Sequence, residues 1–218
     1  MRPGAPLGPG QIYNSNFYGI ASLLEASAME VLDLGIVADD FDATLASLNR
    51  AASEADCIIS SGGVSVGEED HVRAAVTKAG RLDLWKLAIK PGKPFAYGSI
   101  CDKPFFGLPG NPVSAFVTFV LLVKPALLTL AGANNTAYDS YQIEAGFNSP
   151  ASSERQEYLR VVLSVDASGN PRLTPFASQS SGVGSSISAA DGLAIVPPFT
   201  SVKEGDMLRF IPITELVN

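Results

Sequence analysis

The chain has 218 residues, of which 46% are hydrophobic and 17% are charged, and its formal net charge is −7. A chain of this length and composition can bury a normal core in one large domain or two small ones. The net negative charge argues against a protein that binds nucleic acids or anionic membranes in general, because such proteins need an excess of lysine and arginine. The longest apolar run, residues 115–123, is too short to span a bilayer.

The first part of the chain alternates helix-like and strand-like patterns. Residues 1–10 are rich in proline and glycine and are expected to form a linker. Apolar residues at helical spacing predict a helix over residues 15–28, and a strand-like run follows at 31–37. Asp42 is the expected N-cap of a second helix, and residues 56–61 are expected to form a short buried strand.

The alternation continues after a glycine-rich loop. A third helix is predicted over residues 68–79, and a final helix is expected to begin with Asn111 as N-cap and Pro112 at the first helical position. Strands are predicted between these helices at residues 82–89, 94–100 and 104–108. The order favours an α/β fold, a three-layer structure with a mostly parallel sheet covered on both faces.

The composition shifts after residue 135 to serine, glycine and proline. Short β-rich runs, separated by turn residues, predict a small all-β, barrel-like C-terminal domain. These runs are residues 158–163, 192–196 and 207–211. The predicted organisation is a linker at 1–10, an α/β domain at 11–135 and a small β domain at 136–218.

Residues 61–70 place a glycine-rich loop between a buried strand and a helix. Ligands of open α/β sheets bind beyond the carboxyl ends of the strands, where glycines let backbone N–H groups approach a phosphate. Asp70, at the mouth of the loop, is a candidate ligand for a divalent cation, although a helix dipole also favours an aspartate there. Ser65 and Glu68 also fit a capping box, independent of function.

Two further segments have candidate binding groups. Lys90 and Lys93 flank a Pro-Gly turn, so their ammonium groups could converge on one small anion, the alternative being solvated surface lysines. Residues 107–114 form a second strand end that passes through a glycine and proline turn into a helix, which is also explained by capping alone. The single histidine, His71, excludes a multi-histidine metal site and leaves little room for a serine-histidine-acid triad.

Together, the segments 61–70, 86–95 and 107–115 resemble the molybdopterin molybdenumtransferase family, which includes MoeA and the gephyrin E domain. Residues 10–16 add a fourth match, and residues 156–160 and 179–181 are similar to the small C-terminal domain of that family. The resemblance covers nearly the whole chain. It implies the C-terminal half of such an enzyme, because the family has two further domains and a T-G-D-E-L-like strand end upstream.

The resemblance implies a MogA-like, molybdopterin-binding α/β domain followed by a barrel-like domain. The implied reaction is the insertion of molybdate into adenylylated molybdopterin with release of AMP, in molybdenum cofactor biosynthesis. The resemblance further implies assistance by Mg²⁺, a homodimer in the full-length enzyme and a cytoplasmic location. Neither a nucleic acid nor a membrane is expected as a partner.

The resemblance also implies roles for individual residues. Asp70, Lys90 and Lys93 are expected to be catalytic, and Asp70 is expected to hold the metal ion. Lys90, Lys93, Arg160 and Ser181 are expected to hold the molybdate oxyanion, with Ser180 an alternative to Ser181. The residues expected to bind substrate are Ser61, Gly62, Gly63, Ser65, Gly67, Glu68, Pro91, Gly92, Pro109, Gly110, Asn111, Pro112, Ser114, Arg160 and Ser181.

Two other functions stay open at this point. The first is molybdopterin adenylyltransferase activity, which uses a similar α/β domain, but the extra β domain and the Pro-Gly-Asn-Pro-Val-Ser turn speak against it. The second is a non-catalytic pterin-binding or scaffold fragment, as the resemblance to gephyrin permits.

Overall fold

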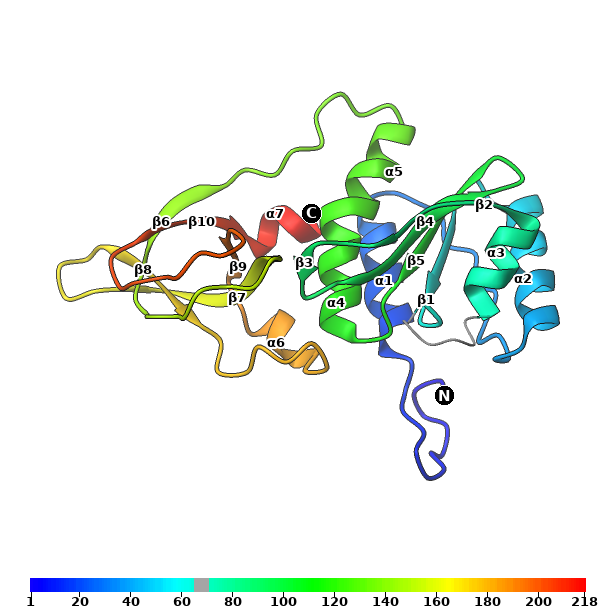
Figure 1. Cartoon of the computed structure of the whole chain (residues 1–218), viewed down its shortest axis with the longest axis horizontal. Coiled ribbons are helices and arrows are strands. Elements are labelled where there is room, and N and C mark those ends of the chain that lie inside the picture. Colours follow the sequence, from blue (N-terminus) through cyan, green and yellow to red (C-terminus); the bar gives the residue numbers. More distant parts are fainter. Residues whose placement is uncertain (65–70) are drawn as a thin grey trace.

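The computed structural model describes residues 1–64 and 71–218, in which two sheets are joined by a long buried helical run (Figure 1). The first sheet has the strand order β1-β5-β4-β2. Its strands are β1 (Ile58–Ser61), β2 (Gly80–Lys86), β4 (Pro94–Ile100) and β5 (Lys103–Leu108). The predicted architecture, an α/β domain followed by a small β barrel, is confirmed.

The directions of the strands differ from the prediction. Strands β1 and β5 are parallel, whereas β4 runs antiparallel to both β5 and β2, so the sheet is mixed and not mostly parallel. Parallel neighbours need a crossover of a dozen or more residues. Strands β4 and β5 are instead joined by Cys101 and Asp102, whose φ angles of 47° and 63° are typical of a tight hairpin turn.

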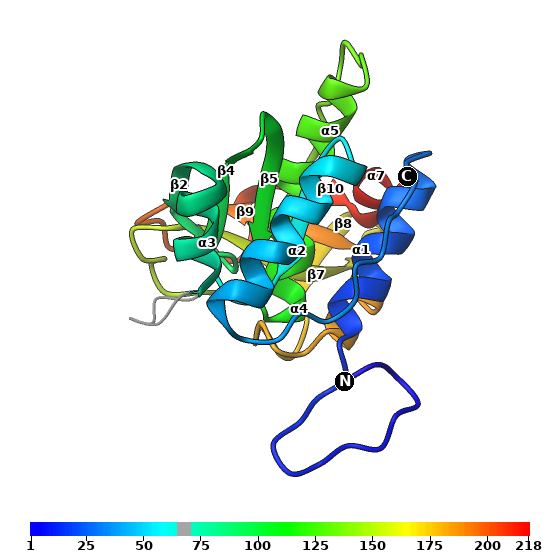
Figure 2. The ribbon, with the colours of Figure 1, turned by 90° about the vertical axis from the view of Figure 1, so that its right-hand side faces the viewer.

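Helices cover both faces of this sheet (Figures 1 and 2). Helices α2 (Phe41–Glu54) and α3 (His71–Ala79) pack on the face that contains Phe105, and α1 (Ser15–Ala26) packs on the face that contains Phe106. Neighbouring residues of a strand point to opposite faces, which separates the two cores. The three predicted layers are therefore present.

Two local predictions in this region are wrong. Residues 31–37 form no strand: most of them are exposed, and Gly35 interrupts the run with a φ of 85°. The N-cap of α2 is Asp40, whose side chain accepts a hydrogen bond from Ala43 N at 2.9 Å, and Asp42 lies in the first turn. An apolar run without a neighbouring strand to pair with does not become a strand.

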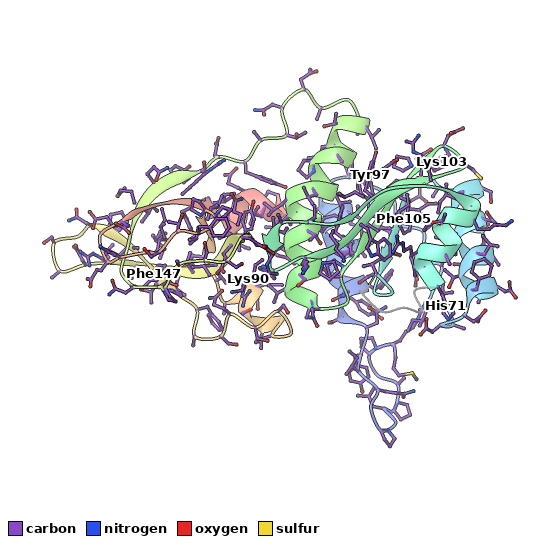
Figure 3. All side chains as sticks on the ribbon, in the orientation of Figure 1. His71, Lys90, Tyr97, Lys103, Phe105 and Phe147 are labelled. Carbon is purple, nitrogen blue, oxygen red and sulfur yellow. The ribbon has the colours of Figure 1, made fainter. Side chains whose placement is uncertain are left out.

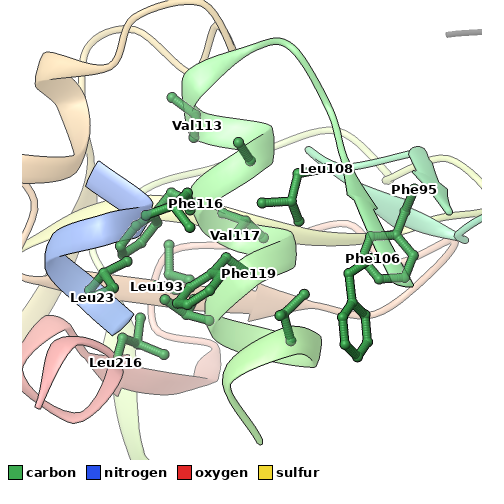
Figure 4. Close-up of a cluster of buried hydrophobic side chains, with 14 of the residues drawn as sticks. Leu23, Phe95, Phe106, Leu108, Val113, Phe116, Val117, Phe119, Leu193 and Leu216 are labelled. Atoms are coloured by element: carbon green, nitrogen blue, oxygen red, sulfur yellow. The ribbon is translucent and has the colours of Figure 1, made fainter. Parts of the chain in front are cut away.

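The final helix of the α/β region begins as predicted, with Asn111 as N-cap and Pro112 in the first turn. It consists of α4 (Pro112–Thr118), a π-helical turn η1 (Phe119–Val123) and α5 (Lys124–Leu130). The whole run is long and apolar enough to cross a membrane, with a mean hydropathy of 2.1, but 61% of it is buried. Its apolar side chains form the core between the first sheet and the barrel (Figure 4).

The second sheet closes into a five-stranded barrel, because β7 pairs with both β8 and β9. Its strands are β6 (Tyr141–Ala145), β7 (Gln156–Val165), β8 (Pro171–Pro175), β9 (Gly192–Val196) and β10 (Met207–Pro212). Two short helices, α6 (Ser185–Ser188) and α7 (Ile213–Val217), flank it. Strand β3 (Ile89–Lys90) comes from the α/β region and adds to β7 in parallel.

The barrel packs directly on the helical run. Leu193, Ile211 and Leu216 belong to the same buried cluster as the apolar residues of α4 and η1. The ammonium group of Lys124, which is buried, donates a hydrogen bond to Leu216 O at 3.1 Å. Residues 1–14 form a separate loop that extends away from both sheets, where the amino group of Met1 donates to Ile12 O at 2.8 Å (Figures 1 and 2). The predicted boundaries at residues 10 and 135 stay predictions.

Candidate functional site

Two of the predicted motif loops meet at one edge of the first sheet. Strands β1 and β5 are parallel, and the pairing of Ser61 with Leu108 places their carboxyl ends together. Gly62 N also donates to Leu108 O at 3.0 Å, just beyond the paired strands. Both Gly62 and Gly63 have positive φ angles, of 85° and 72°. The edge is thus formed by backbone in a conformation that favours glycine.

The two glycines differ in what surrounds them. A Cβ atom on Gly63 would lie 2.5 Å from Cγ2 of Val72 in α3, whereas a Cβ atom on Gly62 would meet no atom within 4 Å. Gly63 therefore allows the loop to pack against α3. Among the described residues, a side chain at Gly62 would meet no neighbour.

Asn16, in the first turn of α1, fastens the two loops to each other. Its Nδ2 donates to Ser61 Oγ at 2.8 Å and to Gly110 O at 2.9 Å, with Pro109 O at 3.4 Å. Asn16 lies in a segment that resembles the family, but it was not among the predicted site residues. Its partners lie 45 to 94 residues away along the chain, so no local pattern identifies them.

Part of the glycine loop, residues 65–70, lies outside the described residues. The expected roles of Ser65, Gly67, Glu68 and Asp70, including metal binding by Asp70, therefore stay predictions. Within residues 1–64 and 71–218, no group of three or more His, Cys, Asp or Glu side chains is placed to hold a metal ion.

The start of α4 joins this edge to the barrel. Asn111 Nδ2 donates to Ser181 Oγ at 3.0 Å, and Val113 N donates to Ser181 O at 3.1 Å. Asn111 occupies the N-cap position of α4, but its side chain forms no capping hydrogen bond because it contacts Ser181 instead. Of the two serines that the sequence left open, Ser181 is the one whose hydroxyl contacts the start of α4, whereas Ser180 Oγ accepts from Gly182 N at 3.4 Å.

One face of α4 connects the predicted lysine turn to Ser181. Asn111, Ser114 and Thr118 have the i, i+3, i+7 spacing that places side chains on a common helix face. A Cβ atom on Gly92 would lie 2.7 Å from Cγ2 of Thr118, so the Pro91-Gly92 turn packs closely on the second turn of α4. The buried Ser114 therefore lies between the lysine turn and the contact with Ser181.

The two predicted lysines have different surroundings. Lys90 Nζ lies 3.1 Å from Glu157 Oε1, and the pairing of Lys90 with Glu157 places both at the junction of β3 and β7 (Figure 3). The Lys90 side chain is 52% exposed and that of Glu157 is 14% exposed. Lys93 is exposed. Glu157, the partner of Lys90, precedes Arg160 by three residues on β7. Three residues span roughly 10 Å along a strand.

Arg160 is the most unusual charged residue of the described chain. It is 1% exposed, and its Nη2 donates to Ser178 O at 2.9 Å and to Ser180 O at 3.2 Å. Nε and Nη1 are buried without a hydrogen-bond partner among the described residues, and no carboxylate there forms an ion pair with this guanidinium. Burial lowers the pKa of Arg160, but arginine stays protonated in proteins.

A buried cation without a counter-charge is energetically costly, and the cost falls when an anion pairs with it. An anion close to the Arg160 guanidinium would therefore be stabilised electrostatically. Two open hollows, of about 380 and 400 Å³, lie elsewhere on the barrel and include none of the predicted site residues in their lining.

Comparison with known proteins follows the same division of the chain. Residues 4–129 match the family described as a probable molybdopterin binding domain, and residues 142–213 match the MoeA C-terminal region, domain IV. The first match covers more than half of the chain, so the fold is that of a molybdopterin-binding α/β protein. The chain belongs to this molybdopterin-binding family, in the form that also has the MoeA C-terminal region.

Its relatives include two bacterial proteins named molybdopterin molybdenumtransferase. The Haemophilus influenzae protein is 50% identical over 129 residues, which are 59% of this chain and 32% of that protein. Molybdopterin molybdenumtransferase 2 of Mycobacterium tuberculosis (strain H37Rv) is 34% identical over 169 residues, which are 74% of this chain and 41% of that protein.

The structure is similar to that of the molybdopterin biosynthesis MoeA protein of Pyrococcus horikosii. The TM-score is 0.82 at 29% identity, over 98% of this chain and 51% of that one. The predicted resemblance is therefore confirmed, and the chain spans about half or less of the length of these relatives.

Proposed function

We propose that this chain binds adenylylated molybdopterin and molybdate, and that it acts as the C-terminal part of an enzyme that inserts molybdate and releases AMP. The observation that carries the proposal is the buried guanidinium of Arg160, two of whose donor atoms have no partner among the described residues. The loop that wraps this group is hydrogen-bonded to the start of α4, beside the glycine loops. An oxyanion site would thus adjoin a phosphate site.

The phosphate end of the proposed site is the edge where β1 and β5 terminate. Gly62 and Gly110 lie in neighbouring loops there, held together by Asn16. Backbone N–H groups in such loops and at a helix N-terminus favour a bound phosphate. Small residues matter here because the backbone must approach the ligand closely.

The oxyanion end lies where α4, β3 and β7 meet. Arg160 would supply charge-assisted hydrogen bonds to the molybdate dianion, with Ser181 and the buried Ser114 as further polar contacts. Lys90 and Lys93 would add positive charge from the neighbouring turn. Glu157 is already bound to Lys90, so one of the three protons of the ammonium group is used within the protein.

Magnesium is part of the proposal only through Asp70, which lies outside the described residues. A divalent cation would neutralise phosphate charge during the cleavage of the adenylylate. The family resemblance also supports a homodimer of the full-length enzyme and a cytoplasmic location.

The contacts of the barrel favour this function over molybdopterin adenylylation. Ser181 and Glu157, both in the barrel region, bind Asn111 and Lys90 of the motif loops. A domain that only adenylylates molybdopterin would not need these contacts. ATP-dependent adenylylation by the purified chain would instead support the alternative.

Calorimetric titration of the purified chain tests the proposal. The ligand is adenylylated molybdopterin, added with and without magnesium and molybdate, while released AMP is measured by chromatography. We expect binding that magnesium strengthens, and we expect Arg160→Met to retain pterin binding while losing molybdate binding. Binding of neither ligand would refute the proposal.

A second arm separates an enzyme part from a scaffold. The N-terminal segment of the Haemophilus influenzae relative is supplied in trans, and AMP release is measured again. AMP release that requires both pieces supports the enzyme. Binding of both ligands without any AMP release supports the scaffold.

A further inference from the structure

Gln179 makes an unusual set of hydrogen bonds to the backbone of Arg160. Its Oε1 accepts from Arg160 N at 3.1 Å, and its Nε2 donates to Arg160 O at 2.8 Å. Nε2 also donates to Phe176 O at 3.0 Å. One amide side chain thus satisfies both backbone groups of a strand residue, as a neighbouring strand would.

This contact lies just beyond the end of a paired strand. The β7–β8 pairing ends with Val161 opposite Pro175, so Arg160 is the next residue of β7 without a β8 partner. Phe176 N then donates to Arg160 O at 2.8 Å, and Gln179 completes the ladder. The turn after β8 is therefore fixed to β7 at the residue that holds the buried guanidinium.

The same short segment contacts both sides of the proposed oxyanion site. Ser178 O and Ser180 O accept from Arg160 Nη2, which leaves Nε and Nη1 as the atoms without partners. Ser181, two residues after Gln179, contacts Asn111 and Val113 at the start of α4. Gln179 lies at the centre of this segment.

We propose that Gln179 is a positioning residue of the oxyanion site. It fixes residues 178–181 so that their carbonyl groups orient the Arg160 guanidinium while Ser181 reaches α4. This inference rests on the proposed function, because it assigns the Arg160 and Ser181 region to molybdate. Without the Gln179 amide, the segment loses three hydrogen bonds, and both ends of the site become mobile.

The test compares Gln179→Met and Gln179→Glu with a matched control, Gln156→Met. Gln156 also lies on β7, and its Nε2 donates to Tyr158 Oη at 2.6 Å without contacting residues 178–181. Molybdate alone is titrated by calorimetry, and hydrogen exchange is measured at the amides of Arg160 and Val113. Gln179→Glu keeps the size and the acceptor atom but loses the donor.

We expect both Gln179 variants to weaken molybdate binding by about tenfold. We also expect faster exchange at both amides, although Val113 does not contact Gln179. The control should change neither. A purely structural role would lower the unfolding temperature without changing molybdate affinity well below that temperature.

Wild-type affinity in both Gln179 variants, or unchanged protection at Val113, would overturn the positioning role. Failure of the proposed function gives a different result, because the wild-type chain itself would then bind no molybdate. In that case Gln179 would be an ordinary loop anchor, and the inference would fail with the function. Should Gln179→Met not fold, the loss of protection at Val113 in Gln179→Glu still tests the positioning role, because an added negative charge alone would not expose that amide.

Discussion

The edge of the first sheet and the barrel differ in the kind of binding group that each would provide to the proposed ligands. At the sheet edge the proposed group is the backbone of two glycine loops, which the side chains of Asn16 and Ser61 hold together. At the barrel the main group is one long cation, Arg160, buried and wrapped by carbonyl oxygens. A glycine loop requires only a suitable local backbone conformation. A buried arginine requires distant segments of the chain to pack around its charged group.

The two regions are joined by a few side-chain contacts. Asn111 with Ser181 and Lys90 with Glu157 connect residues that lie 70 and 67 positions apart in the chain. The comparison therefore predicts that changes at the sheet edge affect pterin binding and local stability. Changes at the barrel should affect molybdate, and changes at the junction should affect the coupling between the two.

The largest expected effect is at Arg160. Arg160→Met should weaken molybdate binding by about a hundredfold, because two charge-assisted hydrogen bonds are lost. The free energy of unfolding should change little, because the variant also removes a buried cation that has no carboxylate partner among the described residues. Calorimetry and urea unfolding measure the two effects. The control is Arg209→Met, an exposed arginine of the barrel; equal molybdate affinity in both variants would contradict the comparison.

The next effect is at the sheet edge. Gly63→Ala should lower the free energy of unfolding by about 1–3 kcal/mol, because a positive φ and a contact with Val72 oppose a Cβ atom. Gly62→Ala is the matched control, with a positive φ but free space, and should cost only about 1 kcal/mol. Urea unfolding tests the order of the two variants, and equal costs would mean that the loop can move away from α3.

A smaller effect is expected for the lysines. Lys90→Ala should weaken molybdate binding by about tenfold, with partial rescue at high molybdate concentration. Lys93→Ala should act in the same direction. Lys103→Ala is the control, since Lys103 also has one carboxylate partner, Asp56, at 3.4 Å. Exposed ion pairs contribute little to stability, so none of the three should unfold the chain, and an unchanged dependence on molybdate would mean that both lysines are surface charges.

The junction should show energetic coupling. A double-mutant cycle of Asn111→Ala and Ser181→Ala should give a coupling free energy of about 0.5–1.5 kcal/mol, as expected for one hydrogen bond. Urea unfolding of the four proteins measures it. Additive effects within error would show that the two side chains do not interact in solution.

The smallest effect concerns alkaline pH. Burial raises the pKa of the Cys57 thiol in the first region from 9.0 to about 12, and that of Tyr138 before the barrel from 10.0 to about 12. The folded chain keeps these protons while the unfolded chain loses them, so stability is lost as the pH rises from about 9 towards 12.

Cys57→Ala should remove the part of this loss that begins near pH 9, and Tyr138→Phe the part that begins near pH 10. Urea midpoints measured between pH 8 and 12 test both variants. A pH profile identical to that of the wild type in each variant would contradict the assignment.

Much of the sheet edge could be predicted from the sequence. Buried strands that end in glycine turns are local patterns, and the bounds of β4 and the start of α4 at Asn111 agree with the prediction. The strand predicted at residues 31–37 was wrong because an apolar run also needs a neighbouring strand, which the sequence does not reveal. The mixed sheet was missed because the turn at Cys101 and Asp102 was not recognised as a hairpin.

The barrel side of the site was less predictable. Arg160 and Ser181 were assigned through the family resemblance, and nothing in their local sequence shows that the arginine is buried. Asn16, Glu157 and Gln179 were not assigned to the site at all. Their contacts join residues 19 to 94 positions apart, which composition and periodicity cannot locate.

The sequence by itself thus determined the order of the elements, the glycine loops and the family, because these depend on short patterns and local backbone preferences. The tertiary structure was needed to show that Arg160 is buried with no carboxylate partner among the described residues, that Ser181 meets the start of α4, and that β3 adds to the barrel. The physical reason is that burial and pairing are set by which distant segments exclude water together, and this information is spread over the whole chain.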